Sequence, residues 1–132
     1  MKTILLLEDE SSFRGLFRWL LQGYAIVEAT TAQQGTFGHR DQRIDLLIAD
    51  TPIIGSGIRV ALEMRSLIPD LRVILVSRQD RSKTADTAAL GAFPSGSAVV
   101  LKKPFFPAVL LDRVHELIGE PVSRGRRLLS ER

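Results

Sequence analysis

The 132-residue sequence predicts an α/β fold, a doubly wound parallel sheet of five strands with five helices on its faces. Short apolar runs alternate along the chain with segments whose apolar residues recur at a helical period. The runs are almost wholly apolar, which is typical of parallel strands buried on both faces. The composition, 45% hydrophobic and 25% charged residues, is that of a globular domain with one core.

The apolar runs predict five strands, each short and without a helical period. The expected strands are Thr3–Leu7, Ala25–Ala29, Ile44–Ala49, Arg72–Val76 and Ala98–Leu101. The segments between and after them predict five helices, of which the second is weak because it contains Gly35 and Gly38. The helices are expected from Ser11 or Ser12 to Gly23, from Thr30 or Thr31 to His39, from Ile58 to Ile68, from Ser82 to Leu90, and from Pro107 to Gly119. We expect one domain over residues 1–119, and a basic tail or the start of a linker over residues 120–132.

Polar side chains follow four of the predicted strands. The first strand is followed by Glu8-Asp9-Glu10, the third by Asp50, the fourth by Ser77 and the fifth by Lys102-Lys103. The carboxyl ends of parallel strands meet at one edge of a sheet, where ligands of such folds bind. Carboxylates about 4 Å apart repel each other by roughly 4 kcal/mol per pair at an effective dielectric of about 20. A divalent cation bound between them usually offsets this repulsion. A single acid at a strand end is more often a helix cap, as Glu10 could be. The combination of acids, a hydroxyl and a lysine favours phosphoryl transfer to a carboxylate.

The motifs Leu7-Glu8-Asp9-Glu10, Asp50, Ser77 and Lys103-Pro104-Phe105 together resemble those of a known family. Over about residues 2–119 the chain resembles a response-regulator receiver (CheY-like) domain of two-component signalling. The resemblance implies a flavodoxin/CheY-like three-layer fold with strand order 2-1-3-4-5, and a cis peptide before Pro104. Asp50 would be the phosphoacceptor, Lys103 would pair with the phosphoryl group and Ser77 would hydrogen-bond to it. The implied Mg²⁺ ligands are Glu8, Asp9, Asp50 and the backbone carbonyl of Pro52.

The resemblance also implies partners and a location. Phosphate would come from a histidine kinase or a histidine phosphotransfer protein, and the output would be a downstream protein target or an output domain. The domain would be no enzyme beyond its own phosphorylation and dephosphorylation. The absence of cysteine excludes disulfides and thiolate metal sites. The start of the sequence reads as neither a signal peptide nor a membrane span, which suggests the cytoplasm and no membrane contact. Ala108 and Leu111, off the main apolar face of the last helix, suggest a surface for a homodimer or another partner.

The sequence departs from the family pattern at four places. Ile54 stands where the family usually has proline, and Arg78 follows the switch hydroxyl where a small residue is usual. Val100 replaces the usual aromatic residue or histidine, so switching would run through Ser77 and loop motion without aromatic gating. Residues 93–97, Phe93-Pro94-Ser95-Gly96-Ser97, look like an insertion before the last strand.

These departures leave other functions open. The main alternative is a degenerate receiver that acts as an interaction module without phosphorylation. A phosphatase of the aspartyl-phosphate type is disfavoured, because Pro52 stands where those enzymes have a second acid. A nucleic-acid binder is suggested only by the arginines after residue 123, and the residues after Gly119 are too few for a helix-turn-helix.

Overall fold

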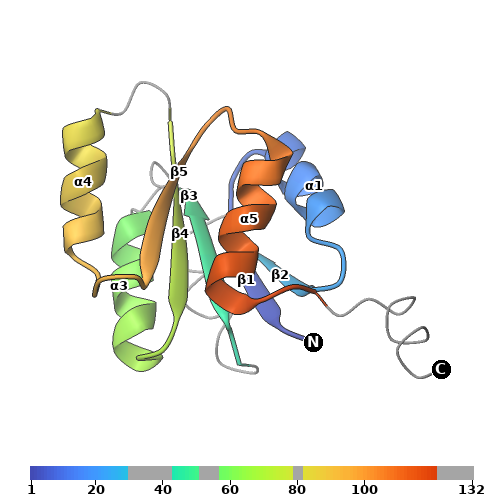
Figure 1. The fold of residues 1–132 in the computed structure, drawn as a ribbon, viewed down its shortest axis with the longest axis horizontal. Helices are drawn as coiled ribbons and strands as arrows, with labels where there is room; N and C mark the ends of the chain where they lie inside the picture. The colour runs from blue at the N-terminus through green and yellow to red at the C-terminus, as the bar shows by residue number, and fades with distance from the viewer. Residues whose placement is uncertain (30–42, 51–56, 79–81, 122–132) are drawn as a thin grey trace.

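A parallel five-stranded sheet in the order β2-β1-β3-β4-β5 forms the centre of the molecule (Figure 1). The computed structural model describes residues 1–29, 43–50, 57–78 and 82–121. The strands are β1 (Thr3–Leu7), β2 (Ala25–Ala29), β3 (Leu46–Asp50), β4 (Arg72–Ser77) and β5 (Ala98–Lys102). This order confirms the predicted topology. The last three strands each end one residue later than predicted, so Asp50 and Ser77 belong to strands.

Four of the five expected helices lie within the described residues. They are α1 (Ser11–Leu20), α3 (Gly57–Leu67), α4 (Lys83–Gly91) and α5 (Pro107–Ile118). The second expected helix, from Thr30 or Thr31 to His39, lies outside the described residues. The N-cap of α1 is Glu10, which the sequence left open as a cap, and not Ser11 or Ser12; its side chain makes no capping hydrogen bond. Ser82, the expected first residue of α4, is its N-cap, and its hydroxyl accepts a hydrogen bond from the Ala85 N–H at 3.0 Å.

Two helices cover each face of the sheet, α1 and α5 on one side and α3 and α4 on the other (Figure 1). Successive strand residues point to opposite faces, and the core follows this alternation. Ile4 and Leu6 pack in the cluster with α1 and α5, whereas Leu5 and Leu7 pack in the cluster with α3 and α4. Burial on both faces explains why these strands are almost wholly apolar.

The connection from α4 to β5, residues 93–97, is anchored in the core. The Phe93 side chain is buried in the cluster of α3 and α4, and the Ser97 hydroxyl donates a hydrogen bond to the Pro94 carbonyl at 2.6 Å. Gly96 has a φ of 80°, which favours glycine. This segment is thus a closed turn with its own core contact.

The face of α5 differs in part from the prediction. Leu110, Val114 and Ile118 are its buried residues. Leu111, predicted to lie off the apolar face, is partly buried against the cluster of α1 and α5, whereas Ala108 is exposed. Leu111 therefore offers less surface to a partner than the sequence suggests. None of the helices described is long and apolar enough to cross a membrane.

Candidate functional site

The strand register brings the predicted site residues to one edge of the sheet. Leu7 pairs with Ala49, and Asp50 pairs with Val76, so the ends of β1, β3 and β4 are level. Ser77 pairs with Lys102 on β5, and the Lys103 N–H donates to the Ser77 carbonyl at 2.8 Å. Lys103 precedes Pro104 through the expected cis peptide bond. The chain therefore delivers acids, a hydroxyl and a lysine to neighbouring positions.

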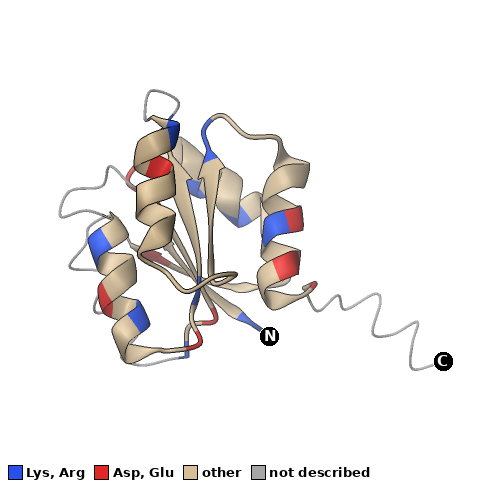
Figure 2. Ribbon diagram, turned by 60° about the vertical axis from the view of Figure 1, so that its left-hand side comes forward, with Lys and Arg blue, Asp and Glu red and all other residues tan. Residues whose placement is uncertain are grey.

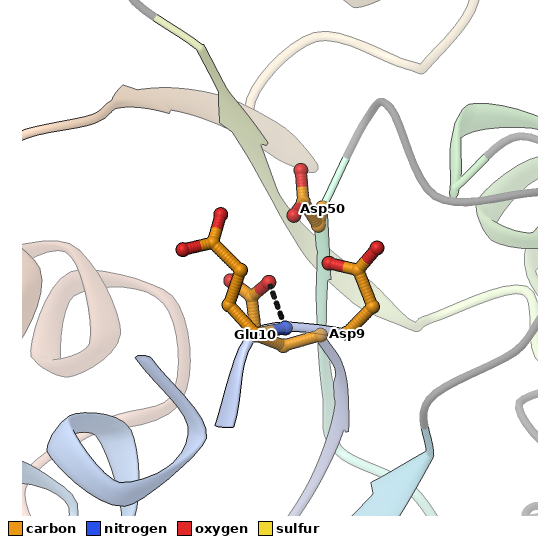
Figure 3. Close-up of side chains that lie close together, drawn as sticks. Asp9, Glu10 and Asp50 are labelled. Atoms are coloured by element: carbon orange, nitrogen blue, oxygen red, sulfur yellow. Dashed lines mark hydrogen bonds between the residues drawn. The ribbon is translucent and has the colours of Figure 1, made fainter. Parts of the chain in front are cut away.

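Four carboxylates gather at this edge. Glu8, Asp9, Glu10 and Asp50 each place an oxygen within 4.8 Å of the others. Figure 3 shows the Asp9 and Glu10 side chains rising from the chain after β1 toward Asp50. Glu8 and Asp50 are each only 1% exposed, whereas Asp9 is exposed and the Glu10 side chain is 43% exposed. The cluster thus has a buried half and a half that reaches solvent.

Lys103 is the cation of this cluster. Its ammonium nitrogen lies 2.8 Å from Glu8 Oε1, 3.4 Å from Asp50 Oδ2 and 3.4 Å from Glu10 Oε1. Burial alone would lower the pKa of Lys103, but these carboxylates outweigh it and raise that pKa. The nitrogen also lies 3.9 Å from the centre of the Phe13 ring, a cation–π contact. Lys103 is therefore a fixed positive charge beside Asp50.

One lysine does not satisfy the buried acids. Among the described residues, Glu8 Oε1 and Asp50 Oδ1 are buried without a hydrogen-bond partner. Lys103 is at ion-pair distance from Glu8 Oε1, but the contact lacks hydrogen-bond geometry. Burial raises the pKa of Glu8 from 4.5 to about 7; the neighbouring Asp50 adds to the rise and Lys103 opposes it. The metal-free cluster thus takes up a proton near neutral pH.

The donor set fits a hard divalent cation. Mg²⁺ prefers carboxylate and carbonyl oxygens and usually keeps several waters. Within the described residues the cluster offers four carboxylates, and the Asp50 oxygen without a hydrogen-bond partner there is of the kind that such an ion would bind. Pro52, whose carbonyl was expected to complete the ligand set, lies outside the described residues, as does Ile54.

The Ser77 hydroxyl does not join this cluster. It donates a hydrogen bond to Asp86 Oδ1 of α4 at 2.8 Å, and Asp86 Oδ2 lies 2.9 Å from the Lys102 ammonium. The sequence analysis missed Asp86, and it placed Lys102 at the end of its strand without giving it a role. A signal was present, because Asp86 lies three residues before the buried Ala89 and so shares the inner face of its helix.

The described surface carries charges of both signs. In Figure 2, α3 and α5 each show Lys or Arg and Asp or Glu. On α3, Arg59 lies 3.5 Å from Glu63, and on α5, Arg113 lies 2.7 Å from Glu116. This mixture differs from the clustered basic face of a typical nucleic-acid binder. The arginine-rich tail lies outside the described residues.

Comparisons with known proteins identify the family of this chain. The family model described as the response regulator receiver domain matches residues 4–115, most of the chain. The chain belongs to the response regulator receiver family. No curated protein matches the sequence. A CheY-like response regulator receiver domain protein from Methanospirillum hungatei JF-1 is 24% identical, with a TM-score of 0.77, and the match covers 88% of this chain and 92% of that one. Chemotaxis protein CheY4 from Vibrio cholerae is 20% identical, with a TM-score of 0.78, over 89% of this chain and 99% of that one.

A further structural match is to a longer protein. NtrX from Brucella abortus is 22% identical with a TM-score of 0.78, and the match covers 99% of this chain but 29% of that one. In NtrX the matching receiver-like part is thus a minor share of the chain. Such identities support the shared fold alone. The general role of the receiver family is phosphorylation-dependent switching in two-component signalling, and receiver domains generally bind Mg²⁺ at an acidic pocket.

Proposed function

We propose that Asp50 accepts a phosphoryl group from the phosphohistidine of a histidine kinase or phosphotransfer protein. The main support is the state of the Asp50 carboxylate. Oδ1 is buried without a hydrogen-bond partner among the described residues, while Oδ2 lies 3.4 Å from Lys103. An unsatisfied carboxylate oxygen beside a fixed cation is suited to nucleophilic attack on an anionic phosphoryl group.

The proposed transfer exchanges one bond for another. A carboxylate oxygen of Asp50 attacks phosphorus, a P–O bond forms and the P–N bond to the donor imidazole breaks. The electron pair of the broken bond stays on the imidazole nitrogen, which takes a proton from solvent. Lys103 balances the negative charge on the phosphoryl oxygens, because its ammonium is already held beside Asp50.

Glu8, Asp9 and Asp50, with the carbonyl of Pro52, are the residues that we propose to hold Mg²⁺. When bound, Mg²⁺ supplies charge neutralisation to the transferring phosphoryl group. The role of this chain's carboxylates is to hold the ion next to the acceptor. Glu8 must lose the proton that its raised pKa retains near neutrality, so loading the site releases a proton.

Phosphorylation can be tested with a small donor. We expect wild-type protein with acetyl phosphate and Mg²⁺ to gain the mass of one phosphoryl group, and Asp50→Asn to gain none. EDTA should prevent the gain. Asp112→Asn removes an exposed carboxylate of α5 and is the matched control, which should label like wild type. Equal labelling of wild type and Asp50→Asn would refute the assignment.

A second candidate function is a receiver that binds its partner without phosphorylation. It is favoured by the Ser77 hydroxyl, which is already bonded to Asp86, and by Val100 in place of the expected aromatic residue. In that case neither acetyl phosphate nor beryllofluoride with Mg²⁺ would react with or bind to the folded wild-type protein. Intact mass spectrometry and calorimetric titration would separate the two candidates.

Output, location and assembly are further parts of the proposal. We propose that the signal passes by protein contact to a downstream target or an output domain, without direct nucleic-acid or membrane binding by residues 1–119. A kinase-dependent phosphate supply favours the cytoplasm, where ATP is present. A homodimer remains a prediction, and its surface would rest on Ala108 more than on the partly buried Leu111.

A further inference from the structure

The Ser77 side chain lies in a polar contact between two strands and a helix. Ser77 and Lys102 are direct neighbours across β4 and β5, and such neighbours project to the same face of a sheet. On that face α4 places Asp86 so that Oδ1 accepts from the Ser77 hydroxyl at 2.8 Å and Oδ2 pairs with Lys102 at 2.9 Å. One carboxylate therefore joins β4, β5 and α4.

This contact is protected from water at its centre. Ser77 is fully buried and Asp86 is 8% exposed, while the Lys102 side chain is 39% exposed. A hydrogen bond to an ionised carboxylate in such a place is stronger than one between neutral groups. The Ser77 hydroxyl has a second, longer contact, to the Arg78 carbonyl at 3.3 Å. A hydroxyl carries a single proton. While the Ser77 hydroxyl donates to Asp86, it cannot donate to another acceptor.

Lys102, the last residue of β5, and Lys103, which directly follows it, serve different sites. Lys103 reaches Glu8, Asp50 and Glu10, whereas Lys102 reaches Asp86. The alternation of side chains along the strand separates them. The Ser77 hydroxyl belongs to the Lys102 group, and the Asp50 carboxylate belongs to the Lys103 group.

We infer that Asp86 is a positioning residue that withholds the Ser77 hydroxyl from the phosphoryl site. The inference rests on the proposed function of Asp50. A phosphoryl oxygen on Asp50 can receive the Ser77 proton only after the bond to Asp86 breaks. Breaking it gives up a hydrogen bond of 2.8 Å in a largely buried contact, which is costly. A phosphoryl group on Asp50 thereby affects α4 through the Asp86 carboxylate. The same carboxylate weakens the binding of a phosphoryl mimic at Asp50, because it competes for the Ser77 proton.

Beryllofluoride with Mg²⁺, which mimics a bound phosphoryl group, provides the test. Asp86→Ala removes the competing acceptor, so calorimetric titration should show binding about tenfold tighter than wild type, the worth of one charge-assisted hydrogen bond. Asp86→Asn keeps an acceptor for Ser77 but loses the charge that pairs with Lys102, so its gain in affinity for beryllofluoride should be smaller. Asp86→Asn also replaces Asp86→Ala as the test variant if Asp86→Ala does not fold. Asp112→Ala, on the exposed face of α5, should bind like wild type.

A second background separates positioning from a general effect on the fold. In Ser77→Ala the hydroxyl is absent, so adding Asp86→Ala should change the affinity by no more than about twofold. Equal affinity of wild type and Asp86→Ala would overturn the inference, and so would an equal gain in both backgrounds. Binding by Asp86→Ala but not by wild type would support it.

The beryllofluoride titrations distinguish an error in the role proposed for Asp50 from an error in the role inferred for Asp86. If wild type, Asp86→Ala and Asp112→Ala all bind no beryllofluoride, the phosphoacceptor role of Asp50 is refuted together with the positioning role. If wild type binds and Asp86→Ala merely equals it, Asp50 keeps its role and Asp86 loses the one assigned to it.

Discussion

Glu8 offers a quantitative test of the acidic cluster. Its carboxyl is 1% exposed, and burial raises its pKa from 4.5 to about 7, with Asp50 adding to the rise and Lys103 opposing it. The folded protein thus holds a proton that the unfolded chain releases near pH 4.5. A pKa difference of one is worth about 1.4 kcal/mol, so the metal-free fold loses roughly 3 kcal/mol of unfolding free energy at this residue.

The sign of this effect is opposite to that of an ordinary ion-paired acid. Below pH 4.5 Glu8 is protonated in both states and contributes no difference. Between pH 4.5 and about 7 only the folded state keeps the proton, so stability falls as pH rises, and above about 7 the loss is complete. Glu8→Gln removes this titration. In EDTA, we expect the unfolding free energy of the variant to rise relative to that of wild type by about 2–3 kcal/mol between pH 5 and pH 8, after allowance for the lost attraction to Lys103.

Urea denaturation at pH 5 and pH 8, with EDTA throughout, measures the difference between variant and wild type. Glu116→Gln is the matched control, because its side chain is 61% exposed on α5, and its difference from wild type should stay nearly constant with pH. A raised pKa of Glu8 is refuted if the difference in unfolding free energy between Glu8→Gln and wild type is the same at pH 5 and pH 8, or if wild type becomes more stable relative to the variant as pH rises.

Two further substitutions test neighbouring charges. Lys103→Met leaves buried acids without their cation and should cost about 3 kcal/mol in urea denaturation at pH 8 without metal. A smaller loss is expected at pH 5, which lies below the raised pKa of Glu8; an unchanged midpoint at pH 8 would contradict the contact. At the opposite edge, burial would raise the pKa of Asp45, but the Thr3 N–H and Arg43 outweigh it and lower that pKa. Asp45→Asn should therefore cost about 1 kcal/mol at pH 7, a difference that vanishes as pH falls below 3.8 through the folded pKa. An acid titration in which the difference grows as pH falls would be inconsistent with it.

Much of the fold follows from local patterns. Strands buried on both faces must be apolar throughout, so β1, β3 and β4 are readable as apolar runs, and helix faces repeat every three to four residues. The ends of helices are indicated by only one or two residues each. Glu10 is the N-cap of α1 without a capping side-chain bond, whereas Ser11 and Ser12 have the side chains that usually indicate a cap. The serine side chains therefore placed the N-cap at least one residue too late.

The site was predictable where the strands alone determine it. Asp50 ends a strand, Glu8 and Lys103 directly follow one, and a parallel sheet brings such ends together. Asp86 was not predictable in the same way, because its role depends on how α4 packs against β4 and β5. An acid on a helix is usually exposed, and only the packed structure reveals that this one is 8% exposed and bonded to Ser77.

Mapping the phosphorylated residue tests the proposed role of Asp50 most directly. Borohydride reduces an aspartyl phosphate to homoserine, which peptide mass spectrometry locates in the chain. After treatment with acetyl phosphate and Mg²⁺, we expect homoserine at position 50 in wild type and in Asp112→Asn, and none when EDTA replaces Mg²⁺. Homoserine at position 9 or position 45 with Asp50 unmodified, or no homoserine in folded wild-type protein, would contradict the role proposed for Asp50.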